Sequence, residues 1–472
     1  MTDILHKFHK VYLVGIKGVG MTMLAQFLKE KGAIVSGSDN PDVFLTDAVL
    51  KKEQIKFANH FALKNIPSDV QLVIHSSAYS PENNIELAYL AKQKKIKVLN
   101  YASALGEVFS AYQGVAVCGS HGKTTTSAWL GYVLWKAGLE PNVLVGSSVP
   151  QFKSSGLVGK SKLFVAEADE YQNKLQYFFP YGVVLNNIDY DHPDFYKTKA
   201  AYAKAFRDFT AKIPVAGFLV ANDSDKQVRA LYSQVKGWIL NYDVVLDKKE
   251  YLKKKGKVRF LAYDHYLKDG YQYFTVNDLG VFKIKLLGRH NIYNALAVIA
   301  AAFALGVEMP VIKKQLATFK GTTRRAQHLG TFNGVPVFDD YAHHPTEVKA
   351  TLAAFKEAYP DKKIITVFHP HTFTRTLALF DDFKKSFADT DELIILNIYG
   401  SAREQQGGTS SQELIAAIKA WNKEQRRRQP VIFKKDLAQV EDYLRQHLKG
   451  NDLLLLMGAG DIFRVGENLL KK

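Results

Sequence analysis

The residues with the clearest chemical potential form the run Gly-Ser-His-Gly-Lys-Thr-Thr-Thr at positions 119–126. The run follows the apolar residues 115–117 and precedes the mostly apolar residues 128–134, which predicts a strand, a tight loop and a helix. Glycines let such a loop turn its N–H groups toward an anion, Lys123 adds a mobile positive charge, and the hydroxyl of Thr124 suits Mg²⁺. The loop is therefore predicted to bind the phosphates of a nucleotide through Gly119, Ser120, His121, Gly122, Lys123, Thr124 and Thr125.

Two further apolar runs end in residues that can bind a metal ion. Residues 163–166 lead to Glu167, and residues 182–188 lead toward His192. Ligands of parallel sheets gather at the carboxyl ends of the strands, so both runs should meet the loop at one edge. A magnesium–nucleotide site needs oxygen ligands besides the phosphates, and Glu167 and His192 are the best-placed candidates. Four acids compete with them, and spacing alone does not rank the six: Asp169, Glu170, Asp189 and Asp191.

A third group of polar residues follows two predicted strands in the last third of the chain. The group comprises Asp339, Asp340, His343, His344, His369, His371 and Arg375. Zinc could bind there, but no spacing of the His-Glu-x-x-His type is present. Arg375 suits a carboxylate or phosphate better than a metal. Anion binding is therefore favoured over zinc, and histidines that cap helices are the structural alternative.

A glycine-rich turn, Gly15 to Gly20, follows the apolar strand predicted over 11–15. Its order is G-x-x-G-x-G, whereas the dinucleotide fingerprint is G-x-G-x-x-G. A nucleotide or diphosphate could still bind at the start of the following helix, predicted over 21–31, and a purely structural turn is the alternative. Further strands are predicted at 33–39, 72–75 and 97–99, which indicates a parallel α/β sheet.

The chain divides into three α/β segments, 1–111, 112–320 and 321–472. The second segment changes over 245–287 to short alternating strands with glycine turns, which predicts a small antiparallel patch. A helix is predicted from 295 to 305, where Gly306 would stop it. In the third segment, strands are predicted at 336–339, 364–368, 393–396 and 453–457.

Length and composition indicate a soluble globular protein. The 472 residues suggest two to four domains, and 47% hydrophobic with 23% charged residues allows sizeable cores. No apolar run approaches the roughly 18 residues that span a bilayer, and residues 1–7 lack the apolar core of a signal peptide, so membrane insertion is not expected. The single cysteine, Cys118, is expected to be a small buried residue and fits a reducing cytoplasm, the predicted location.

The net charge of +17 raises the question of nucleic-acid binding. Most basic residues are dispersed, however, and two tight runs look peripheral. Residues 253–257 are predicted as a turn between strands, and residues 426–428 close a helix-like stretch before Pro430. We therefore expect a basic surface that attracts small polyanions, such as a nucleotide or a nucleotide-sugar, and no nucleic-acid partner.

Taken together, these motifs resemble those of the Mur ligases, the ATP-dependent amide-forming enzymes of peptidoglycan synthesis. The resemblance covers essentially the whole chain, and it is strongest to members that join L-alanine to UDP-N-acetylmuramate. It rests on motifs at 15–21, 37–39, 76–78, 119–126, 167–170, 187–192, 290–295, 324–325, 339–347, 370–376 and 458–462.

The resemblance implies an α/β enzyme of three domains, with ATP and Mg²⁺ as cofactors. The domain over 1–111 would be Rossmann-like and bind the UDP moiety, and that over 112–320 would be P-loop ATPase-like, with a parallel sheet and the antiparallel patch. The domain over 321–472 would be Rossmann-like and bind the amino acid. The carboxylate of UDP-N-acetylmuramate would take the γ-phosphate of ATP, and the amine of L-alanine would then displace phosphate from the acyl phosphate.

The resemblance also implies roles for individual residues. Catalytic roles are expected for Lys123, Glu167, His192 and Arg325, and magnesium contacts for Thr124, Glu167 and His192. Besides the phosphate loop, ATP would contact Asn291, Asn294, Arg325 and Asp340. The UDP-sugar would contact Gly15, Gly18, Gly20, Ser38, Asp39, Ser77 and Ala78. The L-alanine pocket would consist of Tyr341, His343, His371 and Arg375.

Two positions depart from the family pattern. The family usually has Glu-Ala-Asp-Glu-Ser-Asp where this chain has Tyr171 after Glu170, and it has an arginine where this chain has Thr372. Tyr171 lies in the stretch that faces the sugar-carboxylate substrate in the family. Thr372 removes a positive charge near the carboxylate of the amino acid. A ligase that recycles a murein tripeptide is therefore the alternative within the family. Two alternatives from other classes are a nicotinamide-dependent oxidoreductase and a P-loop ATPase regulator that forms no new bond. The sequence leaves the oligomeric state open between monomer and homodimer.

Overall fold

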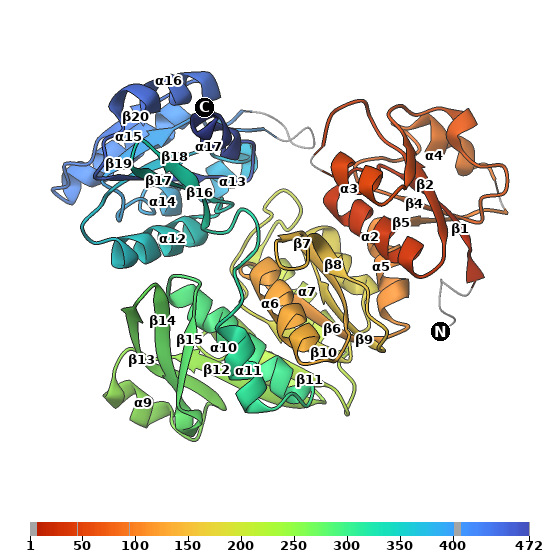
Figure 1. Ribbon diagram of the computed structural model, residues 1–472, viewed down its shortest axis with the longest axis horizontal. Helices are drawn as coiled ribbons and strands as arrows, with labels where there is room; N and C mark the ends of the chain where they lie inside the picture. The colour runs from red at the N-terminus through yellow and green to blue at the C-terminus, as the bar shows by residue number, and fades with distance from the viewer. Residues whose placement is uncertain (1–6, 45, 94, 401–406, 472) are drawn as a thin grey trace.

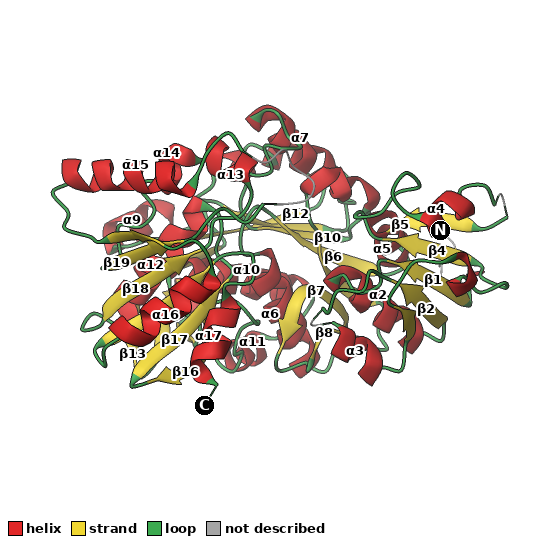
Figure 2. Cartoon of the chain, turned by 90° about the horizontal axis from the view of Figure 1, so that it is seen from above, coloured by secondary structure: helices red, strands yellow, loops and turns green. Residues whose placement is uncertain are grey.

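The computed structural model describes residues 7–44, 46–93, 95–400 and 407–471. Its strands form three separate sheets that follow one another along the chain, each covered by helices (Figures 1 and 2). Most of the N-terminal stretch in which we predicted no signal-peptide core, residues 1–6, lies outside the described residues. Among the residues described, no helix has both the length and the apolar character needed to cross a membrane.

The first sheet is a small parallel α/β unit. Its elements are β1 (Lys10–Val14), α2 (Val19–Glu30), β2 (Ile34–Ser38), α3 (Asp47–Lys52), β3 (Lys56–Ala58), η1 (Leu63–Asn65), β4 (Leu72–His75), α4 (Ile85–Leu90), β5 (Lys97–Asn100) and α5 (Tyr101–Phe109). The strand order is β3-β2-β1-β4-β5, and all neighbours are parallel. The order reverses between β1 and β4, which is where ligands bind in sheets of this kind. The glycine-rich turn after β1 lies at this point.

The second sheet is the largest. Its elements are β6 (Gln113–Cys118), α6 (Lys123–Lys136), β7 (Asn142–Val149), β8 (Ser154–Leu157), β9 (Leu163–Glu167), η2 (Tyr171–Tyr177), β10 (Gly182–Leu185), α7 (Lys199–Thr210), β11 (Phe218–Asn222), α8 (Lys226–Arg229), η3 (Tyr232–Gln234), β12 (Trp238–Val244), α9 (Lys248–Lys254), β13 (Phe260–Lys268), β14 (Tyr271–Val276), η4 (Asn277–Leu279), β15 (Val281–Ile284), α10 (Arg289–Ala304) and α11 (Met309–Leu316). The order is β15-β14-β13-β12-β11-β10-β6-β9-β7-β8. The seven central strands of this order, from β13 to β7, are parallel to one another. At one end β14 and β15 pair antiparallel, and at the other end β8 pairs antiparallel with β7. The predicted antiparallel patch is thus confirmed, and it continues the edge of this sheet.

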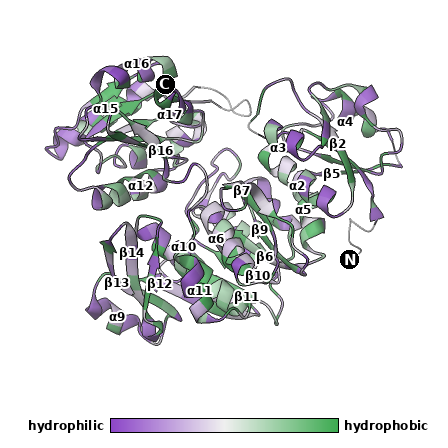
Figure 3. Ribbon diagram, viewed as in Figure 1, coloured by the Kyte–Doolittle hydropathy of each residue, from purple (hydrophilic) through white to green (hydrophobic). Residues whose placement is uncertain are grey.

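The core of the second sheet explains why its strands are continuous apolar runs. Strands β6, β10 and β11 are covered on both faces, so nearly every residue in them is buried. Helices α6 and α10 are almost entirely buried and pack against each other. Cys118, at the end of β6, is buried as predicted. Figure 3 shows hydrophobic residues concentrated in the strands of this sheet.

Helix α10 and the lysines at 253 and 254 differ from the sequence prediction. Helix α10 begins at Arg289 rather than at 295, because Gly288 turns the chain with φ of +88° and the polar residues that follow already form the first turn. Lys253 and Lys254, predicted in a turn, form the end of α9. The start of α10 was missed because its polar residues face a cavity rather than an apolar core.

The third sheet mixes one antiparallel pair with a parallel α/β arrangement. Its elements are β16 (Gln327–Phe332), β17 (Val335–Asp340), α12 (Pro345–Ala358), β18 (Lys363–Phe368), α13 (Phe373–Ala378), α14 (Phe380–Phe383), β19 (Glu392–Ile395), α15 (Ser411–Glu424), β20 (Val431–Phe433), α16 (Leu437–His447), β21 (Asp452–Met457) and α17 (Phe463–Leu470). The order is β16-β17-β21-β18-β19-β20, and only β16 is antiparallel to its neighbour. The carboxyl ends of β17 and β18 carry the histidine-rich segments.

Candidate active site

The phosphate loop connects β6 to α6 and turns on two glycines. The angle φ is +127° at Gly119 and +80° at Gly122, values that side chains rarely adopt. A Cβ atom at Gly122 would lie 2.5 Å from Oδ1 of Asn294, so no side chain fits there. Helix α6 begins at Lys123, which gives the predicted order of strand, loop and helix. Phosphate binding by the loop stays a prediction.

The side chain of Lys123 folds back over the loop. Its ammonium donates to the carbonyl oxygen of Gly119 at 2.6 Å and to Oε2 of Glu170 at 2.8 Å. Burial lowers the pKa of Lys123, but Glu170 and the nearby acids Asp169 and Glu167 outweigh this and raise it above its ordinary value. Lys123 is therefore held as a cation at the end of the loop.

The predicted magnesium ligands lie in two neighbouring groups. Oγ1 of Thr124 donates to Oε1 of Glu167 at 2.9 Å, at the ends of α6 and β9 that face the loop. His192 instead lies with Asp169 and Glu170, whose ligand atoms are all within 4.8 Å of one another. Lys123 pairs with Glu170 and lies near Glu167, so it adjoins both groups. These oxygen donors beside the phosphate loop fit a magnesium ion that is bound together with nucleotide phosphates.

The structure shows what the four acids that spacing left open contact, and Asp169 pairs with Lys174 at 2.6 Å. Glu170 is fully buried and accepts hydrogen bonds from Lys123 and from the hydroxyl of Tyr202 at 3.0 Å. Asp191 forms an ion pair with Arg375, and Asp189 forms one with His121. Asp191 and Asp189 therefore hold other side chains, whereas Glu170 belongs to the group around Lys123.

A cavity of about 1030 Å³ lies between the second and third sheets, next to the phosphate loop. Its volume suits a nucleotide-sized ligand. The predicted ATP residues that line it are His121, Gly122, Thr125, Asn291, Asn294, Arg325 and Asp340. Nδ2 of Asn294 donates to Oδ1 of Asn291 at 3.0 Å, which orients both amides on the first turns of α10. The structure thus brings part of the loop and the two amides predicted to hold adenine to one cavity, whereas four predicted loop residues do not line it: Gly119, Ser120, Lys123 and Thr124.

Arg325 and Asp340 contribute charge to the cavity from the third sheet. The Asp340 carboxylate accepts from the backbone N–H groups of Ala326 at 2.7 Å and Ala342 at 2.8 Å, and burial raises its pKa. The Arg325 guanidinium lies over the ring of Tyr341, 5.1 Å from its centroid. Arg325 also faces Glu347, with Nη1 3.9 Å from Oε1.

The four residues predicted for the amino-acid pocket form one cluster. The ring of His343 lies 5.3 Å from that of Tyr341 and 6.1 Å from that of His371, between centroids. Nη1 of Arg375 is 3.4 Å from Nδ1 of His371. Burial lowers the pKa of His343 to about 3, so this ring is neutral. Nε and Nη2 of Arg375 are bound to Asp191, a contact that the sequence did not reveal.

The predicted UDP-sugar residues lie at the carboxyl ends of β1, β2 and β4. Ser38 and Asp39 are buried, and their side chains make hydrogen bonds within the first domain. Oγ of Ser38 donates to Glu86 at 2.5 Å, and Asp39 accepts from the N–H of Lys17 at 2.7 Å and from the hydroxyl of Tyr79 at 2.9 Å. The remaining predicted positions are Gly15, Gly18 and Gly20 in the turn and the exposed Ser77 and Ala78.

Tyr101 connects the glycine-rich turn with the acids of the second sheet, and sequence reasoning missed it. A Cβ atom at Gly20 would lie 2.7 Å from Cζ of Tyr101. Burial raises the pKa of Tyr101, and the charges of Glu167 and Asp169 raise it further. The first residue of α5 therefore lies between the predicted sugar site and the predicted magnesium site. No motif pointed to it, because its nearness to the acids depends on how the first two domains pack.

The polar residues of the third segment do not converge on one ion. Asp339 pairs with Arg324, at 3.1 Å between Oδ2 and Nε. His344 caps α12, which agrees with the alternative that histidines of this segment cap helices. Among the described residues, the His, Cys, Asp and Glu groups close enough to hold a metal ion are His121–Asp189–His344 and Asp169–Glu170–His192. Of the described polar residues of the third segment, His344 alone belongs to either group, and its Nδ1 caps α12.

Sequence comparison assigns all three parts of the chain to one family. The sequence model described as "Mur ligase family, catalytic domain" matches residues 10–113, the "Mur ligase middle domain" matches residues 117–302, and the "Mur ligase, glutamate ligase domain" matches residues 324–460. The domain boundaries at 111/112 and 320/321 stay predictions.

Similar proteins span the full length of the chain. A UDP-N-acetylmuramate–L-alanine ligase of Caldanaerobacter subterraneus subsp. tengcongensis is 37% identical over 471 residues, which cover 99% of this chain and 98% of that protein. One of Aquifex aeolicus is 35% identical over 470 residues, which cover 99% and 98%.

Solved structures share the fold. The UDP-N-acetylmuramate–alanine ligase of Thermotoga maritima superposes with a TM-score of 0.79 at 24% identity, over 98% of both chains. A murein peptide ligase of Psychrobacter arcticus gives a TM-score of 0.70 at 22% identity, again over 98% of both chains. With three matching domains, full-length relatives and a site built around the phosphate loop, the chain belongs to the Mur ligase family of enzymes.

Proposed function

We propose that the chain joins L-alanine to the carboxylate of UDP-N-acetylmuramate at the expense of ATP, as a step in peptidoglycan precursor synthesis. The observation that carries the proposal is the arrangement of two sites from different domains. The phosphate loop with Lys123 lies at the carboxyl edge of the second sheet, and Arg375 of the third domain is bound to Asp191 at the same edge. The names of the full-length relatives support this choice of substrates. The need for ATP makes the cytoplasm the expected compartment.

In the first step, a carboxylate oxygen of the muramoyl group attacks the γ-phosphorus of ATP, and ADP leaves. Lys123 lies at the end of the loop where it would face the negative charge that develops on the transferring phosphoryl group. Asn291 and Asn294 would hold the adenine, and Asp340 the ribose, in the adjoining cavity. Thr124, Glu167 and His192 would hold magnesium, which neutralises phosphate charge when bound.

In the second step, the amine of L-alanine attacks the acyl carbonyl, and the C–O bond to phosphate breaks. The attacking amine must first lose a proton to solvent, because the His343 ring, with a pKa of about 3, is too weak a base to take it. Tyr341 and His343 would enclose the small side chain, and Arg375 with His371 would face the carboxylate. Positioning of three substrates from three domains should supply most of the rate enhancement.

The test is release of phosphate from ATP in the presence of UDP-N-acetylmuramate, with L-amino acids added one at a time and the product identified by mass. We expect release that requires both co-substrates and a product one alanyl residue heavier than UDP-N-acetylmuramate. Hydrolysis that needs neither co-substrate would indicate a P-loop regulator instead.

One observation favours a second candidate. The chain has Tyr171 where the family usually has serine, and the hydroxyl of Tyr171 donates to Oδ2 of Asp194 at 2.7 Å. In the family resemblance, tyrosine at this position is a feature of the murein tripeptide recycling ligases. The same assay with an L-alanine-containing tripeptide distinguishes the two, because a tripeptide adduct as the main product would support the recycling activity.

A further inference from the structure

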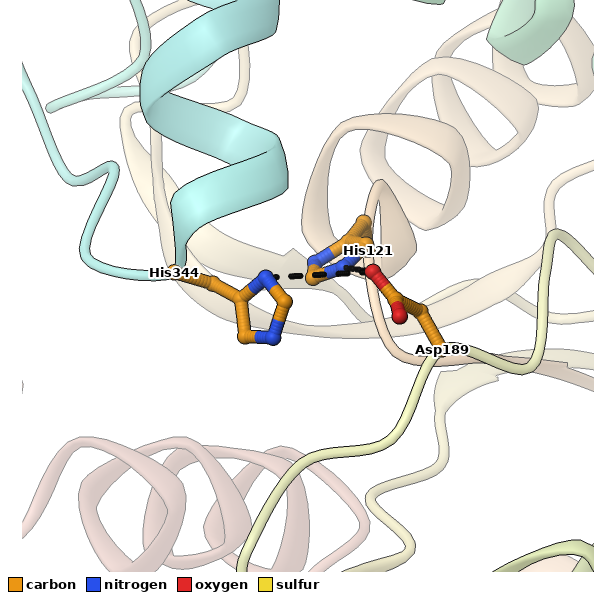
Figure 4. A group of neighbouring side chains, drawn as sticks. All are labelled: His121, Asp189 and His344. Atoms are coloured by element: carbon orange, nitrogen blue, oxygen red, sulfur yellow. Dashed lines mark hydrogen bonds and ion pairs between the residues drawn. The ribbon is translucent and has the colours of Figure 1, made fainter. Parts of the chain in front are cut away.

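The phosphate loop is joined to the third domain through one histidine. Nε2 of His121 lies 2.9 Å from Oδ2 of Asp189, and Nδ1 lies 3.2 Å from Oε1 of Glu347 (Figure 4 shows the first contact). Asp189 belongs to the same domain as the loop, whereas Glu347 lies in the first turn of α12. The His121 side chain is only 14% exposed. One ring therefore spans the boundary between two domains.

The two contacts determine the charge of the ring. A neutral imidazole has one N–H and one lone pair, so it can donate to only one carboxylate. Both ring nitrogens of His121 face carboxylate oxygens, which requires both to donate. Burial lowers the pKa of His121, but the hydrogen bonds and charges of Asp189 and Glu347 outweigh burial and raise it to about 9. His121 is an imidazolium ion between two anions.

A metal ion is the competing explanation for this group. His121, Asp189 and His344 offer ligand atoms within 4.8 Å of one another. However, Nδ1 of His344 accepts from the N–H of Thr346 at 3.2 Å and so caps α12. The lone pair nearest to Asp189 is therefore engaged, and the positive charge that the two carboxylates need is already supplied by His121. The geometry fits an imidazolium better than a metal.

The partners of His121 are themselves fixed by the third domain. Oγ1 of Thr346 donates to Oδ2 of Asp189 at 2.7 Å, so Asp189 also reaches across the boundary. Glu347 accepts from the N–H of His343 at 3.2 Å and closes the capping box of α12. Helix α12 has 14 residues, and an anion at its N-terminus is favourable. The contact thus fixes the start of α12, directly beside the predicted amino-acid pocket.

We propose that His121 is a positioning residue that holds the third domain closed against the phosphate loop, so that the amino acid meets the activated carboxylate. The inference rests on the proposed function, because it assigns the phosphate loop to the transfer of phosphate from ATP and the third domain to the attack by the amino acid. It predicts that loss of the contact weakens use of L-alanine far more than it weakens binding of ATP. A residue that only bound phosphate would affect ATP first.

The chain offers a matched control pair. Nε2 of His265 on β13 lies 3.4 Å from Oε1 of Glu357, near the other end of α12. This pair also joins the second and third domains, but Glu357 is 43% exposed and neither residue lines the cavity beside the phosphate loop. Exposed pairs contribute little, so His265→Gln should leave the kinetics nearly unchanged. Any effect specific to His121 can then be assigned to its position.

The experiment compares His121→Gln, Glu347→Gln, the double variant and His265→Gln in the full chain. Glutamine at 347 keeps the capping box and removes only the charge. We expect kcat/KM for L-alanine to fall about 10- to 100-fold in each of the first two variants, since small displacements cost about that much. The double variant should lose no more than either single variant, because the two residues form one contact. Affinity for a fluorescent ATP analogue should fall much less than kcat/KM in Glu347→Gln, even though Glu347 lines the cavity and faces Arg325.

A second readout is independent of turnover. Small-angle scattering with a non-hydrolysable ATP analogue should show a larger radius of gyration for His121→Gln and Glu347→Gln than for the wild type and His265→Gln. This measurement separates the inference from the proposed function, because it needs no product. If His121→Gln fails to fold, Glu347→Gln alone provides the test. Equal dimensions in all four proteins, losses that add in the double variant, or stoichiometric binding of Zn²⁺ by the wild type that His121→Gln abolishes would overturn the proposal.

Discussion

Arg375 and Asp191 form a two-point ion pair between the third and second domains, with Nε 3.0 Å and Nη2 3.3 Å from the two carboxylate oxygens. Both side chains are only 7% exposed. Burial alone would raise the pKa of Asp191, but Arg375 and the nearby histidines His192 and His344 hold it well below the ordinary value. Asp191 binds Arg375 of the predicted amino-acid pocket, and the next residue in the sequence, His192, is a predicted magnesium ligand. The two predicted sites are therefore connected through adjacent residues.

This pair leads to the first prediction. Arg375→Ala leaves Asp191 buried without its partner, which typically destabilises a protein by about 3–5 kcal/mol. The variant should therefore unfold at lower temperature and should also lose affinity for L-alanine. The control is Lys356→Met, which removes an exposed pair with Asp391 at 3.3 Å and should change stability by less than about 1 kcal/mol. Differential scanning calorimetry and the KM for L-alanine measure the two effects, and an Arg375→Ala protein as stable as Lys356→Met would contradict the prediction.

The second prediction concerns Lys123. Lys123→Ala should reduce phosphate release on the order of 10²-fold or more, because the charge that faces the transferring phosphoryl group is lost. The loop itself should keep its shape, since Gly119 and Gly122 determine the turn. The buried Glu170 loses one partner but keeps the hydroxyl of Tyr202.

The double variant Lys123→Ala with Glu170→Gln separates stability from catalysis. Removing the orphaned charge should restore thermal stability without restoring turnover. Near-normal phosphate release in Lys123→Ala would refute this assignment of the active site.

The third prediction follows from the raised pKa of His121. A basic group whose pKa is raised in the folded state stabilises that state fully below its unfolded pKa, about 6.5, and loses this contribution as pH rises through about 9. The groups facing the ring are Asp189 and Glu347, with His344 beside it, and Arg325 and His343 face Glu347.

The difference in the free energy of unfolding between the wild type and His121→Gln should therefore be largest near pH 6 and smaller by up to about 3 kcal/mol at pH 9.5. Urea denaturation at pH 6, 8 and 9.5 measures it. A difference that stays constant over this range would mean that the ring is not charged in the folded protein.

Much of the fold could be predicted because its strands are continuous apolar runs. Strands such as β6 and β21 are buried on both faces, so their sequence carries a signal that needs no tertiary information. The three-residue strands β3 and β20 are only partly buried and were missed. The longer strands β7, β11, β12 and β16 were also not predicted, although β11 is fully buried. Short edge strands depend on pairing with a neighbour rather than on their own pattern.

The site could be predicted to the level of motifs but not of partners. The sequence indicated that Lys123 and Glu167 would meet at one sheet edge, and the structure brings them there. Arg375 and Asp191 are 184 residues apart, and their contact depends on how two domains pack. The same holds for His121 and Glu347. Interdomain pairs leave no periodic signal in a single sequence, so they appear only in the structure.

The last prediction concerns the amino acid that the chain accepts. Thr372 has φ of +68°, an unfavourable value for a β-branched residue, and it immediately follows His371 in the predicted pocket. The family usually has an arginine there, so one positive charge near the substrate carboxylate is missing. We expect L-alanine to be used with a relatively high KM, and glycine and L-serine to be poorer substrates, in a competition assay read by mass.

Thr372→Arg should lower the KM for L-alanine, because a charge-assisted contact to the carboxylate is restored. Thr372→Gly is the matched control, since it relieves the backbone at the same position and adds no charge. If the missing charge is the cause, only the arginine variant gains affinity, while the glycine variant gains stability. An equal fall in KM in both variants would assign the effect to the backbone at 372, and an unchanged KM in Thr372→Arg would remove the charge explanation.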